Sequence, residues 1–212
     1  MKSKSGERTL FASVMLSSPG PIVVGIGLML GRSSTQLADF IRRTAELAAI
    51  IISWLIFKIT HKDGAYDAIK KAELERIAGL CVGAAMCLSG AAMLFIALLS
   101  YGGEKGNVIP GLVIAVLGVI VNTWFWFRYS KLNRVTPNAI FAAQSRLYGA
   151  KSLVDTCITL ALGTIAVAPD SSAAIYMDIA GSIAVSVYLV ITGAVTLFGK
   201  QKSKKSGVSS DE

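Results

Sequence analysis

Four ionisable residues lie close together in a stretch that is otherwise apolar. The stretch is 37–58, LADFIRRTAELAAIIISWLIFK, and the four are Asp39, Arg42, Arg43 and Glu46. At about 100° per residue they occupy roughly one third of a helix circumference. Ionisable groups at membrane depth are costly, so they face a protein interior or a water-filled cavity. The stretch therefore predicts a functional site on one face of a membrane helix, with partners elsewhere in the chain.

A second polar stripe occurs in the stretch 138–167. Five of its side chains fall within roughly 100° of one another on a helix: Gln144, Tyr148, Lys151, Ser152 and Asp155. Arg146 points the other way, near the expected interface, where its long side chain can reach polar surroundings. This second stripe is the natural partner of the first.

We expect the two stripes to face each other, with Glu46 against Lys151 and Arg42 against Asp155. Pairs within one helix compete with these contacts, namely Arg42/Glu46, Asp39/Arg43 and Lys151/Asp155. Three carboxylates would balance three cations, as a network in low dielectric requires. Two interpretations stay open: a polar pathway whose carboxylates carry protons or bind an ion, or a self-satisfied network that only fixes helix packing.

The elements that must position these stripes follow from composition. The chain has 212 residues, is 53% hydrophobic and only 16% charged, and has a mean hydropathy of +0.61, which is typical of a multi-spanning membrane protein. Its apolar runs predict an all-α fold of six transmembrane helices, at about 10–31, 36–59, 76–100, 108–130, 138–167 and 174–198. The expected partner is therefore the lipid bilayer.

The net charge of +8 has the pattern of a membrane topology signal, and it does not indicate nucleic-acid binding. Lys and Arg gather in the N-terminal arm, in the second and fourth connections and in the tail. The positive-inside rule then places both termini in the cytoplasm, with the protein in the plasma or inner membrane. We expect three parts: a basic arm at 1–9, a transmembrane domain at 10–198 and a disordered basic and polar tail at 199–212.

The remaining reactive residues do not indicate an enzyme. The three cysteines, Cys81, Cys87 and Cys157, lie inside predicted spans without CxxC spacing, which favours small core residues. The single histidine, His61, is expected in a loop. No nucleophile and base occur at catalytic spacing, and no resident cofactor is indicated.

Five segments in order resemble the transmembrane domain of the cation diffusion facilitator (cation efflux) family, which exports zinc and related divalent metals. They are GRSSTQLADFIRRTAELA, KKAELERIAGL, GLVIAVLGVIVN, FAAQSRLYGAKSLVD and YMDIAGSIAVSVYLVITGA, and the resemblance covers about 10–198. It implies a six-helix transport bundle, a divalent cation such as zinc as substrate, and a possible homodimer.

The metal site that the resemblance implies is altered here. The family's second-helix ligands fall on Arg42 and Glu46, and its fifth-helix ligands fall on Gln144 and Tyr148. Only Glu46 is an ordinary zinc ligand, while Arg42 is a permanent cation that would repel a metal. We therefore expect no classical tetrahedral zinc site.

Two functions stay open. The first is a facilitator-like transporter that moves a cation or another small solute by alternating access. Its pathway residues would be Arg42, Glu46, Gln144, Tyr148, Asp39, Lys151 and Asp155, with Glu46 as the coupling carboxylate and a weak metal ligand. The alternative is a transport-incompetent relative that acts as a structural or regulatory membrane interaction protein.

Overall fold

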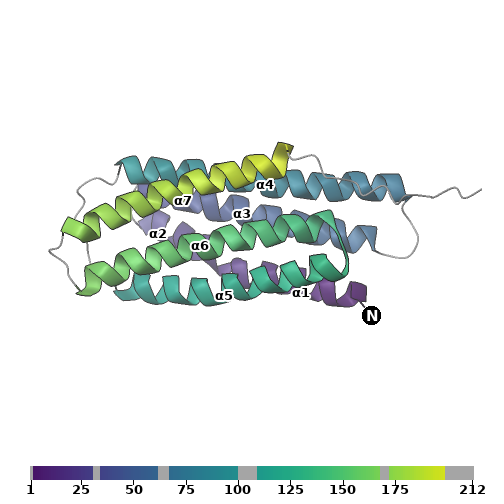
Figure 1. Cartoon of the computed structure of the whole chain (residues 1–212), viewed down its shortest axis with the longest axis horizontal. Coiled ribbons are helices and arrows are strands. Elements are labelled where there is room, and N and C mark those ends of the chain that lie inside the picture. Colours follow the sequence, from purple (N-terminus) through teal and green to yellow (C-terminus); the bar gives the residue numbers. More distant parts are fainter. Residues whose placement is uncertain (1, 31–33, 62–66, 100–108, 168–171, 199–212) are drawn as a thin grey trace, which may run out of the picture.

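The computed structural model describes residues 2–30, 34–61, 67–99, 109–167 and 172–198. Every element in these ranges is an α-helix, and the helices lie side by side along one long axis (Figure 1). In chain order the described helices are α1 (Lys2–Ser17), α2 (Pro19–Leu30), α3 (Ser34–Thr60), α4 (Ala68–Leu99), α5 (Ile109–Val135), α6 (Ala139–Val167) and α7 (Ser172–Phe198). The all-α class expected from the sequence is confirmed. The expected disordered tail, 199–212, lies outside the described residues.

The first predicted span consists of two helices, α1 and α2, separated by Ser18 alone. Pro19 is the first residue of α2, a position where its missing N–H and fixed φ are tolerated. The hydroxyl of Ser18 donates a hydrogen bond of 2.7 Å to the carbonyl of Val14 and so helps to satisfy the end of α1. Because α1 begins at Lys2, most of the segment expected as a basic arm is helical.

Two helices extend beyond the spans that hydropathy predicted. Helix α4 begins at Ala68, well before position 76, and α5 continues to Val135, past position 130. Hydropathy marks the depth of the membrane, whereas the ends of helices are set by stop and start signals. Here Pro137 follows Thr136 and disfavours further helix, and the Asn138 side chain accepts a hydrogen bond of 2.8 Å from Ile140 N at the start of α6.

Four described segments are long and apolar enough to cross a membrane: Ser5–Ile26, Ala68–Phe95, Leu112–Val135 and Ala180–Phe198. Helices α3 and α6 have the length of a span, but they carry the ionisable residues of the two stripes. Large apolar side chains of α5 such as Val113, Ile120 and Phe127 are exposed on its outer face, as lipid-facing residues would be.

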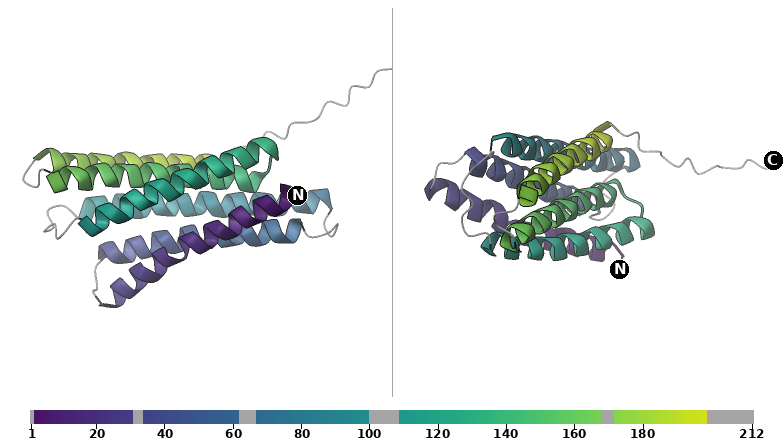
Figure 2. Two further views of the ribbon diagram at one scale, coloured as in Figure 1. Left: turned by 90° about the horizontal axis from the view of Figure 1, so that it is seen from below. Right: turned by 60° about the vertical axis from the view of Figure 1, so that its left-hand side comes forward.

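The packing brings the two polar helices to the interior of the bundle. Helix α3 packs against α1, α2 and α4, and α6 packs against α4, α5 and α7 (Figures 1 and 2). The start of α1, the ends of α3 and α5 and the start of α6 lie together, and we call this the N-terminal end of the bundle. The opposite end is called the far end.

Glycines allow α4 and α7 to approach each other closely. A Cβ added at Gly193 would lie 2.9 Å from the carbonyl oxygen of Gly83, and one at Gly90 would lie 2.8 Å from the carbonyl oxygen of Ser186. Both neighbours are backbone atoms, which cannot move aside without shifting a helix. Small residues at such crossings are typical of helix pairs in lipid.

We predict that Gly90→Ala destabilises the bundle by about 1–3 kcal/mol, because the new methyl group forces α4 and α7 apart. Gly79→Ala is the matched control on the same helix, because a Cβ there meets nothing within 4 Å. It is expected to be neutral or stabilising by up to about 1 kcal/mol. Thermal unfolding in detergent micelles measures both, and equal melting temperatures for the two variants would contradict the close-packing account.

Candidate functional site

A cavity of about 510 Å³ lies among α1, α2, α3, α5 and α6, and we call it the central cavity. Its wall begins near Tyr148 and Phe125 and continues past Asp155 to Ile114 and Leu162, toward the far end. Among its lining residues are most members of the two predicted stripes: Arg42, Arg43, Glu46, Tyr148, Lys151 and Asp155. Helices α3 and α6 therefore present their charged faces to one shared space.

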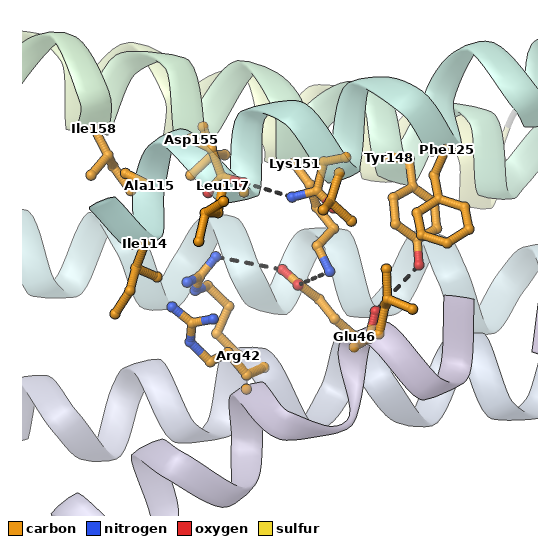
Figure 3. Close-up of a pocket in the computed structure, with 18 of the residues that line it drawn as sticks. Arg42, Glu46, Ile114, Ala115, Leu117, Phe125, Tyr148, Lys151, Asp155 and Ile158 are labelled. Carbon is orange, nitrogen blue, oxygen red and sulfur yellow. Dashed lines mark hydrogen bonds and ion pairs between the residues drawn. The ribbon is translucent and has the colours of Figure 1, made fainter. Parts of the chain in front are cut away.

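Glu46 lies at the centre of the charged cluster and is only 3% exposed. Lys151 Nζ lies 3.1 Å from its Oε2, and Arg42 Nη1 lies 3.7 Å from its Oε1 (Figure 3). The hydroxyl of Ser89 on α4 donates a hydrogen bond of 2.9 Å to the same Oε1. The predicted contact between Glu46 and Lys151 is confirmed, and the competing Arg42/Glu46 pair within α3 forms as well.

The second carboxylate of the cavity, Asp155, is held by α5. Asn122 Nδ2 donates a hydrogen bond of 2.6 Å to Asp155 Oδ2. Gly118 makes room for this carboxylate, since a Cβ there would lie 2.5 Å from Asp155 Oδ2. The expected pairing of Arg42 with Asp155 stays a prediction, and the side chain of Asp39 lies outside the described residues.

The two positions of α6 that correspond to the expected metal ligands are separated. Tyr148 lines the central cavity, and its hydroxyl lies 3.3 Å from Ser17 Oγ, while Lys151 Nζ lies 5.4 Å from the centre of the Tyr148 ring. Gln144 is fully buried one turn closer to the N-terminal end, where its Nε2 donates a hydrogen bond of 2.9 Å to Ser53 Oγ. Gln144 is therefore engaged with Ser53, apart from the Glu46 cluster.

Five aromatic side chains form a layer that closes the central cavity toward the N-terminal end. The aromatic layer consists of Phe57, Phe125, Tyr129, Phe141 and Tyr148, each at most 2% exposed. Consecutive rings are in contact, with centroid distances of 4.9 Å for Phe125–Tyr148, 5.5 Å for Tyr148–Tyr129, 6.4 Å for Tyr129–Phe141 and 5.1 Å for Phe141–Phe57. The hydroxyl of Tyr129 donates to Ser13 Oγ at 2.8 Å, which ties the layer to α1.

The donor set of the cluster does not match a classical metal site. Within the described residues, no group of three or more His, Cys, Asp or Glu side chains could hold an ion. Both oxygens of Glu46 already contact a cation or a hydroxyl. Arg146, which the sequence placed on the opposite face of α6, is exposed and donates a 3.4 Å hydrogen bond to Thr196.

Sequence reasoning missed the hydroxyl groups that complete the cluster. Ser89 contacts Glu46, Ser53 contacts Gln144, and Ser17 contacts Tyr148. A signal existed for Ser89, because it is the only hydroxyl-bearing residue in the segment 76–99. Ser53 carries a similar mark, as the only hydroxyl-bearing residue between Thr44 and Thr60, whereas Ser17 carries none.

Two comparisons with known proteins bear on this arrangement. The family model of the cation efflux transmembrane domain matches residues 10–198. The match runs from the middle of α1 to the end of α7 and contains every residue that lines the central cavity. A search of curated proteins finds no match.

We predict strong coupling between Glu46 and Lys151 in a double-mutant cycle. Lys151→Met leaves a buried carboxylate without its closest counter-charge and should cost about 3–5 kcal/mol. Glu46→Gln combined with Lys151→Met should cost less than the two single changes together, with a coupling of about 1–3 kcal/mol. Reversible unfolding in mixed micelles measures the cycle, with Arg146→Gln on the exposed face of α6 as the control. Additivity of the two changes to within about 0.5 kcal/mol would show that the contact contributes nothing.

Proposed function

The chain belongs to the cation efflux family, and from that premise we propose that it is a membrane transporter working by alternating access. It moves a small charged solute, a cation in the first instance, through the central cavity. The seven residues of the proposed pathway are Arg42, Glu46, Gln144, Tyr148, Asp39, Lys151 and Asp155. Membership of the family and the long apolar helices make the chain a multi-pass membrane protein.

The observation that carries the proposal is a cavity lined by charged side chains that ends at a closed aromatic layer. The lining of the central cavity reaches from Ile114 and Leu162, toward the far end, to Phe125 and Tyr148, which belong to the layer. A transporter whose path is shut toward one side of the membrane needs such a closed layer. Tyr148 belongs to both cavity and layer, and Gln144 with Ser53 is the next polar pair beyond it, so these residues mark the continuation of the path.

Glu46 is the residue best suited to couple a substrate to the conformational change. A cation that enters the cavity competes with Lys151 and Arg42 for the same carboxylate, because both lie within 4 Å of it. Displacing Lys151 would break the ion pair between α3 and α6 and leave the hydrogen bond of Gln144 to Ser53 and the contact of Phe57 with Phe141. Binding and helix movement are then linked through one ion pair, which is the differential interaction that a population shift requires.

Zinc in its usual tetrahedral site is the least suited cation. The side chains with oxygen atoms that line the cavity are Glu46, Asp155, Asn122, Tyr148 and Ser17. Tetrahedral zinc sites are built mostly from His and Cys, whereas oxygen-only sets suit harder cations. The positive charges of Arg42 and Lys151 also suit an anionic or zwitterionic solute.

One observation favours a second function. Glu46 is already satisfied by Lys151, Arg42 and Ser89, so the cluster is complete without any solute. A transport-incompetent relative that serves as a structural or regulatory interaction protein would keep such a network to fix its helix packing. The two functions differ in whether the contact between Glu46 and Lys151 breaks during a cycle.

The orientation and assembly follow from charge and resemblance. Basic residues gather at the N-terminal end, which by the positive-inside rule faces the cytoplasm of the plasma or inner membrane. The far end of the bundle then faces outward. A homodimer is the assembly expected from the family resemblance.

We predict that proteoliposomes containing the protein move at least one cation from a panel of Zn²⁺, Mn²⁺, Cd²⁺, Na⁺ and K⁺ under an imposed pH gradient. Glu46→Gln should abolish this flux, because the amide cannot exchange a cation for Lys151. Arg146→Gln should retain it, since that side chain lies on the exposed face of α6. Silence of the wild type toward the whole panel, with the fold intact by thermal unfolding, would contradict cation transport and leave an anionic solute or the non-transporting relative.

A further inference from the structure

A second cavity lies at the N-terminal end of the bundle, on the other side of the aromatic layer, and we call it the end pocket. It has a volume of about 260 Å³ and lies among the start of α1, the end of α3, the end of α5 and the start of α6. The central cavity does not share any lining residue with it. None of the seven proposed pathway residues lines the end pocket.

The charged groups of the end pocket are all basic. Arg128 and Lys131, one turn apart on α5, line it, and no Asp or Glu is among its lining residues. Arg128 donates a 3.0 Å hydrogen bond to Ser5 Oγ, and within the described part of the chain neither Arg128 nor Lys131 has a carboxylate partner. Two cations that share a concave site without a counter-charge are complementary to an anion.

A third cation, Lys71, lies next to the pocket because it contacts His61, one of the lining residues. The imidazole is stacked on Phe57 at 4.0 Å, and its Nε2 lies 3.4 Å from Lys71 Nζ. Burial and the Lys71 ammonium lower the pKa of His61, so the ring is neutral near pH 7 and accepts a hydrogen bond from Lys71. Lys71 therefore adds a positive charge beside His61, where the carboxylate of Glu75 also lies, and the basic groups of the pocket lining itself are Arg128 and Lys131.

The rest of the wall is largely apolar, which distinguishes this pocket from a site for a hydrophilic anion. Its apolar lining residues are Phe57, Phe141, Leu132 and Val135. A free phosphate or another hydrophilic anion would leave these surfaces bare. An anionic head joined to a hydrocarbon chain would cover both the basic and the apolar parts.

The depth of the pocket matches the headgroup region of a bilayer. Trp124 and Trp126 are exposed on α5 one turn or less before Arg128, and tryptophans at this position mark the membrane interface. Basic residues gather at this end of the bundle, which the positive-inside rule assigns to the cytoplasmic leaflet. That leaflet carries the anionic phospholipids, and basic pockets between membrane helices bind their headgroups.

We propose that the end pocket binds one anionic phospholipid. Its phosphate lies against Arg128 and Lys131, and the first part of its acyl chain lies against Phe57, Phe141 and Leu132. The lipid would join the ends of α1, α3, α5 and α6 on the side of the aromatic layer that must open in a transport cycle.

Native mass spectrometry of the full-length protein, released from a neutral detergent, tests the proposal. Dioctanoyl phosphatidylglycerol, dioctanoyl phosphatidylcholine and glycerol phosphate are titrated separately. The wild type should retain phosphatidylglycerol about tenfold more tightly than phosphatidylcholine, given two cations that each contribute at the lipid surface. Glycerol phosphate, which carries the charge without the chain, should not be retained.

Matched variants separate the pocket from the general charge of this end. Arg128→Gln with Lys131→Gln should remove the preference for phosphatidylglycerol. Lys58→Gln with Arg134→Gln removes the same charge from exposed residues outside the pocket and should keep the preference. Leu132→Trp fills the pocket without a change in charge and should also remove it, which keeps the test valid if the first double variant is unstable.

Three results would overturn the proposal. Equal binding of the two phospholipids by the wild type would remove the role of charge. Equal loss of the phosphatidylglycerol preference in the two double variants, inside and outside the pocket, would assign that preference to the overall charge of this end. Retention of glycerol phosphate as tight as that of phosphatidylglycerol would make the occupant a hydrophilic anion.

Discussion

One buried carboxylate constrains the rest of this bundle. Glu46 is 3% exposed in the middle of a membrane helix, and a charge there is tolerated only if counter-charges and hydrogen bonds replace water. Lys151 from α6, Arg42 from α3 itself and Ser89 from α4 supply them. The requirement therefore fixes three helices around one point, and the apolar outer faces of the remaining helices can then meet lipid.

The same cluster forms the polar part of the central cavity, so packing and function draw on the same residues. If Glu46 exchanges Lys151 for a solute, the contact between α3 and α6 loosens as the solute binds. If Glu46 never exchanges Lys151 for a solute, the ion pair is a permanent structural contact and the cavity is a remnant of the family's transport path. The aromatic layer is closed around Tyr129 and Tyr148, as the resting state of the protein would be in either case.

The sequence predicted the helices and the facing of the two stripes because both depend on simple periodicity. Glu46 against Lys151 followed from depth and charge balance alone, and the outward direction of Arg146 followed from helix geometry. The contacts of Tyr148 with Ser17 and of Gln144 with Ser53 could not be predicted from the sequence. Ser17 and Ser53 are short side chains whose contacts depend on how helices rotate about their axes. Hydropathy also missed the true start of α4 at Ala68, since polar helical turns continue beyond the membrane.

The whole arrangement depends on Glu46 being an ionised carboxylate held by Lys151. Infrared difference spectroscopy of lipid-reconstituted wild type against Glu46→Gln at neutral pH reads its state directly. We expect the wild type to show a carboxylate stretch that disappears in Glu46→Gln. In Lys151→Met the same band should be present but shifted. A protonated carboxyl band that disappears in Glu46→Gln would show that no ion pair exists and would contradict the account.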